Sequence, residues 1–154
     1  MVSCKVHIWA GISMRGATDI AIFTGIMTSS VYQTILDEYL KPFVSTVYPM
    51  GHRLWQDNDP KHTSKSTVNW MRQNGINHWP TPAESPDLNP IERLWAALKY
   101  HIRRRTKPTN KDELTQGIRD FWATVDPAMC ARYIRHIPKA AHLIVANEGG
   151  PAGH

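Results

Sequence analysis

Two polar segments of the sequence carry the residue types that metal-dependent chemistry uses. QDNDPKHTS (56–64) directly follows the apolar pair Leu54 and Trp55, which is typical of the end of a buried strand. A second segment, SPDLNPIERLW (85–95), contains Glu92. In open α/β sheets, ligands and metals bind at the carboxyl ends of strands, so polar residues there could form a site. Asn, Asp and Pro are also common in turns without further function, and the first segment alone leaves both interpretations open.

Asp57 and Glu92 are the two carboxylates that could meet. Thirty-four residues separate them, and these predict one helix, one short strand and one loop, a compact unit that could return Glu92 to Asp57. Mg²⁺ prefers hard oxygen ligands such as carboxylates. Paired ions can activate an attacking water and stabilise a leaving oxygen, which phosphodiester chemistry requires. The alternative for Glu92 is a capping box with Asn89, which would stabilise any helix start.

The hydrophobic pattern predicts the elements that must position these residues. Alternating β-prone stretches at 5–12 and 17–26, joined by SMRG, predict a pair of antiparallel strands. Apolar residues at helical spacing predict most of the rest, and the order of elements indicates a mixed α/β sheet with helices packed on it. The expected helices cover 30–43 (ended or kinked by Pro42), 64–74, 90–102, 110–125 and 127–136, and further strands cover 52–57 and 76–79. We expect one domain over 1–146 and a flexible tail over 147–154.

Composition narrows the class of protein. The chain has 154 residues, 42% hydrophobic and 20% charged, which is typical of a globular domain with a real core. No apolar run reaches the roughly 20 residues that span a bilayer, and the first residues do not resemble a signal peptide, so no membrane partner is expected. Cys4 and Cys130 form no disulfide framework, which indicates a reducing compartment. Two cysteines and the absence of an HxxxH pair also make a zinc enzyme a distant alternative.

The chain is basic, with a formal charge of +5 and a pI near 9.4, which is compatible with a polyanionic partner. Six cations fall within thirteen positions of the second half. They indicate either a solvated helix end or a nucleic-acid contact, and the surrounding HIRRRTKPTNK also predicts nuclear import and a nuclear location. These cations are Lys99, Arg103, Arg104, Arg105, Lys107 and Lys111.

QDNDPKHTS followed by WPTPAESPDLNPIERLWAALK resembles the catalytic domain of Tc1/mariner-type transposases, specifically the Tc1-like branch. The resemblance covers nearly the whole chain, because VHIWAGISMRGAT and YIRHIPKAAHLIVANEGGPAG also resemble the beginning and the end of that domain. It implies an RNase H-like mixed sheet flanked by helices, in the α/β class. It also implies DNA cleavage and strand transfer by an Asp-Asp-Glu triad with two Mg²⁺ or Mn²⁺ ions, in a homodimer that acts on DNA.

The resemblance assigns roles to individual residues. Asp57 matches the second catalytic aspartate and Glu92 the catalytic glutamate, and both would bind metal. His62 would touch DNA or a metal-bound water, or else hydrogen-bond the loop, which is the interpretation we favour. The expected loop-shaping residues are Asn58, Pro60, Asn89 and Pro90, and the expected DNA contacts are Lys61, Lys99, Arg103, Arg104 and Arg105.

The family's first catalytic aspartate, on the central first strand, has no counterpart in this sequence, and Asp19 does not match its motif. We therefore expect an N-terminally truncated, inactive copy that binds at most one ion weakly. The sheet would have a gap beside the strand at 52–57, or a non-native neighbour there, and the monomer would be marginally stable. Without the family's helix-turn-helix region, DNA binding would be weak and indifferent to sequence. The alternative is a non-catalytic DNA-binding or scaffold protein derived from a transposase.

Overall fold

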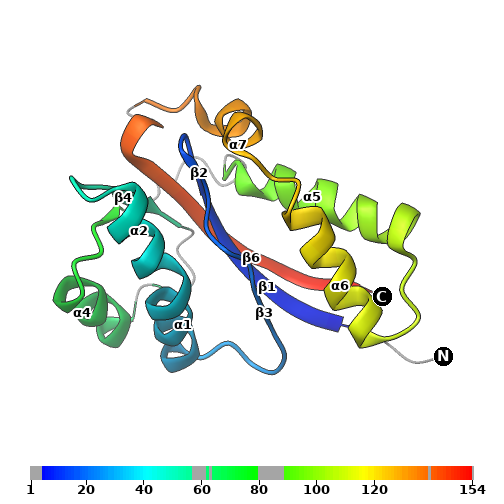
Figure 1. Cartoon of the computed structure of the whole chain (residues 1–154). Coiled ribbons are helices and arrows are strands. Elements are labelled where there is room, and N and C mark those ends of the chain that lie inside the picture. The colour runs from blue at the N-terminus through cyan, green and yellow to red at the C-terminus, as the bar shows by residue number, and fades with distance from the viewer. Residues whose placement is uncertain (1–4, 57–61, 63, 80–88, 139, 154) are drawn as a thin grey trace.

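In the computed structural model, the described residues are 5–56, 62, 64–79, 89–138 and 140–153. They form a mixed sheet with helices on both faces (Figure 1). The strand order is β2-β1-β6-β4-β5, and β3 also pairs with β1. The strands are β1 (Lys5–Ser13), β2 (Gly16–Ala17), β3 (Ala21–Phe23), β4 (Arg53–Trp55), β5 (His78–Trp79) and β6 (Leu143–Gly153).

The predicted antiparallel pair at the start of the chain is confirmed. β1 turns into β2 through Met14 and Arg15, and Ser13 pairs with Gly16. Gly16 has φ of 123°, a conformation that side-chain-bearing residues rarely adopt, so glycine closes the turn. The expected second strand over 17–26 is divided into β2 and β3, both antiparallel to β1.

One face of the sheet is covered by α1 (Ser29–Ile35), the π-helical turn η1 (Leu36–Leu40), α2 (Lys41–Val47) and α4 (Lys65–Gln73). Pro42 does not end this helix, because helical structure continues to Val47, and the alternative of a kink at Pro42 stays a prediction. Pro42 lies in the first turn of α2, directly after η1. A first turn tolerates proline because the missing N–H has no required partner there.

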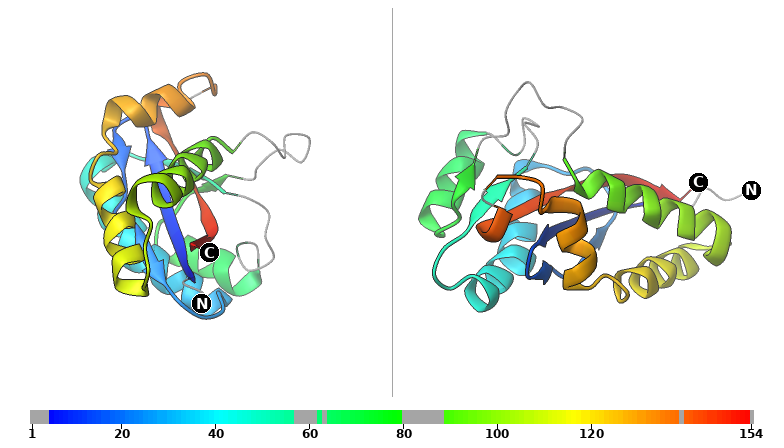
Figure 2. Two further views of the ribbon diagram at one scale, coloured as in Figure 1. Left: turned by 90° about the vertical axis from the view of Figure 1, so that its right-hand side faces the viewer. Right: turned by 90° about the horizontal axis from the view of Figure 1, so that it is seen from above.

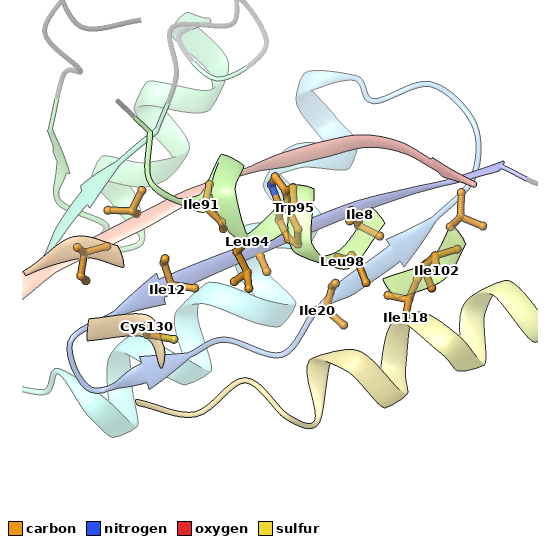
Figure 3. Packing of buried hydrophobic residues seen from close by; sticks show 14 of the residues in the cluster. Ile8, Ile12, Ile20, Ile91, Leu94, Trp95, Leu98, Ile102, Ile118 and Cys130 are labelled. Atoms are coloured by element: carbon orange, nitrogen blue, oxygen red, sulfur yellow. The ribbon is translucent and has the colours of Figure 1, made fainter. Parts of the chain in front are cut away.

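The other face is covered by α5 (Ile91–His101), the π-helical turn η2 (Ile102–Thr106), α6 (Lys111–Trp122) and α7 (Pro127–Ile134) (Figure 2). The predicted apolar stripe of α5 packs over β6, and Trp95 and Leu98 share one buried cluster with Ile8 of β1 (Figure 3). The 3-10 turn η3 (Ala140–His142) leads into β6. Among the described helices, none combines the length and the apolarity needed to cross a bilayer.

The strand β6 lies between β1 and β4, so of the two alternatives for this position the gap is wrong. It runs antiparallel to β1 and parallel to β4, so the position beside β4 is filled and the described sheet has no gap there. The expected flexible tail is also wrong for 147–153, which belong to β6. The physical reason is the apolar run 143–146, which is buried on both faces of the sheet as a central strand requires.

Close packing holds the second half of β6 in place. Trp9 pairs with Glu148 and His7 with Pro151, so β6 has one extra residue between these pairs and forms a β-bulge. A Cβ atom on Gly149 would lie 2.5 Å from Ile8 Cγ1, closer than carbon atoms pack. Glycine at this position therefore lets β6 approach β1 directly after Glu148.

Candidate active site

β4 and β5 end beside one another, next to the parallel strand β6, which continues to Gly153. Trp55, near the end of β4, pairs with Val145 of β6 and with Trp79 of β5. Residues that follow these positions along each strand therefore gather at the same edge, where α/β sheets bind ligands. Asp57 comes two residues after Trp55 in the sequence but lies outside the described residues, as do Asn58, Pro60 and Lys61.

Glu92 lies in the first turn of α5, where the start of the helix is built by the two residues expected to shape it. Asn89 Oδ1 accepts a 3.2 Å hydrogen bond from the backbone N–H of Ile91, and Pro90 is the N-cap residue, one position later than predicted. The Glu92 side chain reaches across to the central strand, where Oε1 accepts a 2.7 Å hydrogen bond from Asn147 Nδ2. Glu92 is exposed, so its carboxylate is open to a ligand.

Asn147 comes from β6 on the face that α5 covers. Side chains alternate along a strand, and Leu143 and Val145 of the same face pack in the cluster beneath α5. Asn147 is only 7% exposed. Its Oδ1 has no hydrogen-bond partner among the residues that the structure describes. An amide and a carboxylate, both oxygen donors, therefore meet at the carboxyl edge of the parallel strands.

His62 lies on the opposite face and is fully buried. Its Nε2 is 2.8 Å from Glu148 Oε1, and its ring stacks on Tyr32 with centroids 4.2 Å apart. Burial lowers the pKa of the neighbouring His78, and the charge on His62 lowers it further. The His62 side chain thus has no exposed surface and contacts Glu148 and Tyr32, and a role for His62 in binding DNA or in holding the loop stays a prediction.

Helix α1 holds both ends of the segment that contains Asp57. On one side, the Tyr32 hydroxyl donates a hydrogen bond to Oε1 of the buried Gln56. On the other, the Ser29 and Ser64 hydroxyl oxygens are 3.1 Å apart, and Gln33 Nε2 donates a 2.8 Å hydrogen bond to Ser66 Oγ at the start of α4. Helix α1 therefore contacts Gln56 and Ser64, the described residues directly before and directly after 57–63.

Four of the predicted DNA-contacting cations follow Glu92 along α5 and η2, while Lys61 lies outside the described residues. Arg103, Arg104 and Arg105 are exposed on η2, and Lys99 is half-buried on α5. Eleven helical residues from Glu92 to Arg103 correspond to about 16 Å along the axis. The guanidinium of Arg104 lies over the exposed ring of Tyr100, 5.6 Å from its centroid. Arg103, Arg104 and Arg105 therefore lie together on an exposed turn, away from Glu92 along the helix.

Sequence reasoning missed Asn147 and Glu148, which lie in the segment taken for a flexible tail. A usable signal was present, because a short apolar run such as Leu143–Ala146 is consistent with a fully buried strand. Within the described residues, no group of three or more His, Cys, Asp or Glu residues is arranged to hold a metal ion. This statement does not extend to Asp57, which lies outside the described residues.

The chain is similar in sequence to known endonucleases and transposases. Residues 3–115 match the DDE superfamily endonuclease family. The Tcb2 transposase of Caenorhabditis briggsae is 28% identical over 147 residues, which cover 96% of this chain and 54% of the relative. The Tc3 transposase of Caenorhabditis elegans is 30% identical over 151 residues, which cover 97% and 46%. The chain thus spans about half the length of these curated relatives.

The fold matches a solved transposase structure. The Mos1 transposase catalytic domain, solved with raltegravir and Mg, superposes with a TM-score of 0.69 over 83% of this chain and 67% of that chain. At 18% identity the match concerns the fold, and it confirms the expected RNase H-like mixed sheet flanked by helices. With the family match covering most of its length, the chain belongs to the DDE superfamily endonuclease family.

Proposed function

We propose that the chain is the catalytic domain of a Tc1-like transposase, which cleaves and joins DNA phosphodiesters with Mg²⁺ or Mn²⁺. The observation that carries this proposal is the Glu92 carboxylate. It stands exposed beside Asn147 of β6, just past the level at which β4 and β5 end, inside the motif that resembles the family's. The names of the similar Caenorhabditis transposases support the same class of reaction.

The described residues fit a divalent ion. Mg²⁺ takes one or two carboxylates, keeps several waters and accepts hard oxygen donors, and the site offers the Glu92 carboxylate and the spare Oδ1 of Asn147. By resemblance, Asp57 adds a second carboxylate. A bound ion would activate water and stabilise the leaving oxygen. Asn147 orients the Glu92 carboxylate, while α1 contacts Gln56 and Ser64 and Glu148 contacts His62.

DNA is the proposed partner, held through its phosphates. The exposed Arg103, Arg104 and Arg105 supply charge without a structure that reads base edges, so binding should be weak, salt-sensitive and nearly independent of sequence. A homodimer and a nuclear location stay predictions from the resemblance and from HIRRRTKPTNK. Light scattering and localisation of a tagged chain would test them.

The decisive experiment is plasmid nicking by the purified chain with Mg²⁺ or Mn²⁺. The missing first aspartate predicts an inactive copy that does not nick, whereas the enzymatic proposal predicts nicking that EDTA stops and that Glu92→Gln removes, because glutamine cannot supply the anionic oxygen that the ion needs. Glu38→Gln, the same change on an exposed part of η1, is the matched control and should leave nicking intact.

A second function is favoured by one observation. The described residue that faces Glu92 from the central strand is an amide, Asn147, whereas a two-ion site requires carboxylates. DNA binding without any nicking by the parent chain would indicate the non-catalytic DNA-binding protein and would refute the enzymatic proposal for this chain.

A further inference from the structure

We propose that Asn147 is a ligand of the divalent ion and binds it together with Glu92 through Oδ1. The inference rests on the proposed function, because it takes the same class of ion, Mg²⁺ or Mn²⁺. It adds a residue from β6, some 55 positions from Glu92 in the sequence, to a site otherwise expected from two continuous motifs.

The first support is the orientation of the Asn147 side chain. Nδ2 donates to Glu92 Oε1 at 2.7 Å, so the amide group lies directly against the carboxylate. Oδ1 is bonded to the same carbon as Nδ2 and therefore lies within a few ångströms of Glu92 as well. The two side chains can present oxygen atoms to one ion.

The second support is the unsatisfied oxygen itself. Asn147 is 7% exposed, and its Oδ1 accepts no hydrogen bond from the described residues. Buried polar atoms in folded proteins nearly always have a partner, and an exception is explained by a catalytic role, an ion or a water. A divalent cation is a partner for Oδ1 that also satisfies the Glu92 carboxylate beside it.

The surroundings favour a cation over a purely structural hydrogen bond. Among the described residues, no lysine, arginine or histidine forms an ion pair with Glu92. The adjacent Glu148 points to the other face of the sheet and pairs with His62, which leaves Asn147 as the side chain of β6 that faces Glu92. A purely structural hydrogen bond to Glu92 needs only Nδ2 of Asn147, whereas a metal ligand at this position also uses Oδ1.

The test measures Mn²⁺ binding to the folded chain without DNA, by water-proton relaxation and by calorimetry. We expect Asn147→Ala to weaken Mn²⁺ binding by about 10–100-fold, the reduction typical of altered metal-site residues. Asn147→Asp should tighten it, because a carboxylate replaces the amide oxygen. Asn69→Ala and Asn69→Asp make the same changes on the exposed surface of α4 and should leave the affinity unchanged.

A second measurement covers the possibility that Asn147→Ala does not fold. Asn147→Asp keeps the shape but places two carboxylates together, so its Tm without metal should be lower than that of the parent. Mn²⁺ should then raise the Tm of Asn147→Asp more than that of the parent or of Asn69→Asp. An equal rise in all three would overturn the proposal.

The outcomes separate this inference from the proposed function. If Glu92→Gln weakens Mn²⁺ binding while Asn147→Ala binds as the parent does, the role of Asn147 is refuted and the metal-dependent function stands. If both variants bind Mn²⁺ as tightly as the parent, the ion does not occupy this site and both proposals are refuted.

Discussion

Two consecutive residues of β6 each hold a residue from a different sequence motif. Asn147 donates to Glu92 on the α5 face, and Glu148 pairs with the buried His62 on the opposite face. Strand geometry makes this possible, because neighbouring side chains point to opposite faces. The pair therefore links the two motifs through the central strand, although neither residue belongs to either motif.

Removing the Glu148 carboxylate should destabilise the fold. We expect Glu148→Ala to lower the free energy of unfolding by about 1–3 kcal/mol, because His62 is fully buried and would be deprived of a hydrogen-bond partner. Urea titration followed by tryptophan fluorescence measures this decrease. Glu38→Ala, on the surface, should change stability by no more than about 0.5 kcal/mol, and equal effects of the two changes would contradict the structural role.

Individual site residues can be predicted from the sequence when they lie within a motif. Residues that join two motifs, such as Asn147 and Glu148, cannot. The spacing of Asp57 and Glu92 and the turn chemistry of Asn89 and Pro90 are local patterns. The Asn147–Glu92 and Glu148–His62 contacts span 55 and 86 positions, and no local propensity reports such distances. They follow only from the position of a strand in the sheet.

Among the elements, the edge formed by β4 and β5 depends on a neutral histidine. His52 Nε2 accepts a 3.1 Å hydrogen bond from the Asn77 backbone N–H, and Asn77 Nδ2 donates to the His52 carbonyl at 2.9 Å. A protonated ring has no lone pair with which to accept. Burial lowers the pKa of His52 below its ordinary value of 6.5, and that of His78 is lowered by burial and by His62.

Stability should therefore fall in acid as protons are taken up at this edge. With the pKa lowered in the folded state, the unfolded chain binds protons first as the pH drops below about 6.5, so the free energy of unfolding decreases from there downward. His52→Gln keeps an acceptor that does not titrate and should flatten the acid limb of a stability–pH curve. His136→Gln, an exposed histidine in the C-terminal half, is the control, and a limb unchanged by His52→Gln would disprove the assignment.

Elements with a strong periodic pattern are predictable, and those set by tertiary packing are not. The stripe Ile91, Leu94, Trp95, Leu98 and Ile102 marks α5 because a helix buries one face. By contrast, β6 combines a four-residue apolar run with NEGGPAG, whose glycines and proline are typical of a loop. The fit of Gly149 against Ile8 and the backbone pairing with β1 outweigh that local preference.

For the molecule as a whole, we expect the distribution of positive charge to determine how the chain binds DNA, its proposed partner. Replacing Arg103, Arg104 and Arg105 by alanine should weaken binding uniformly across sequences and reduce the salt slope of log K by about 1 for each arginine that binds a phosphate. Titrations of labelled duplexes at several salt concentrations measure both effects. Arg72, Arg132 and Arg135, three exposed arginines on α4 and α7, form the matched control, and a similar weakening in that triple variant would argue against a localised DNA surface.

The central place of β6 also sets an order of events during folding. β1 and β4 form early in the chain, but the strand that joins them begins at Leu143, after every helix of the described structure. Pairing so distant in sequence is slow, because the entropic cost of loop closure comes before the contacts form. During synthesis, β1 and β4 would leave the ribosome with exposed backbone edges, open to wrong partners until the last strand arrives.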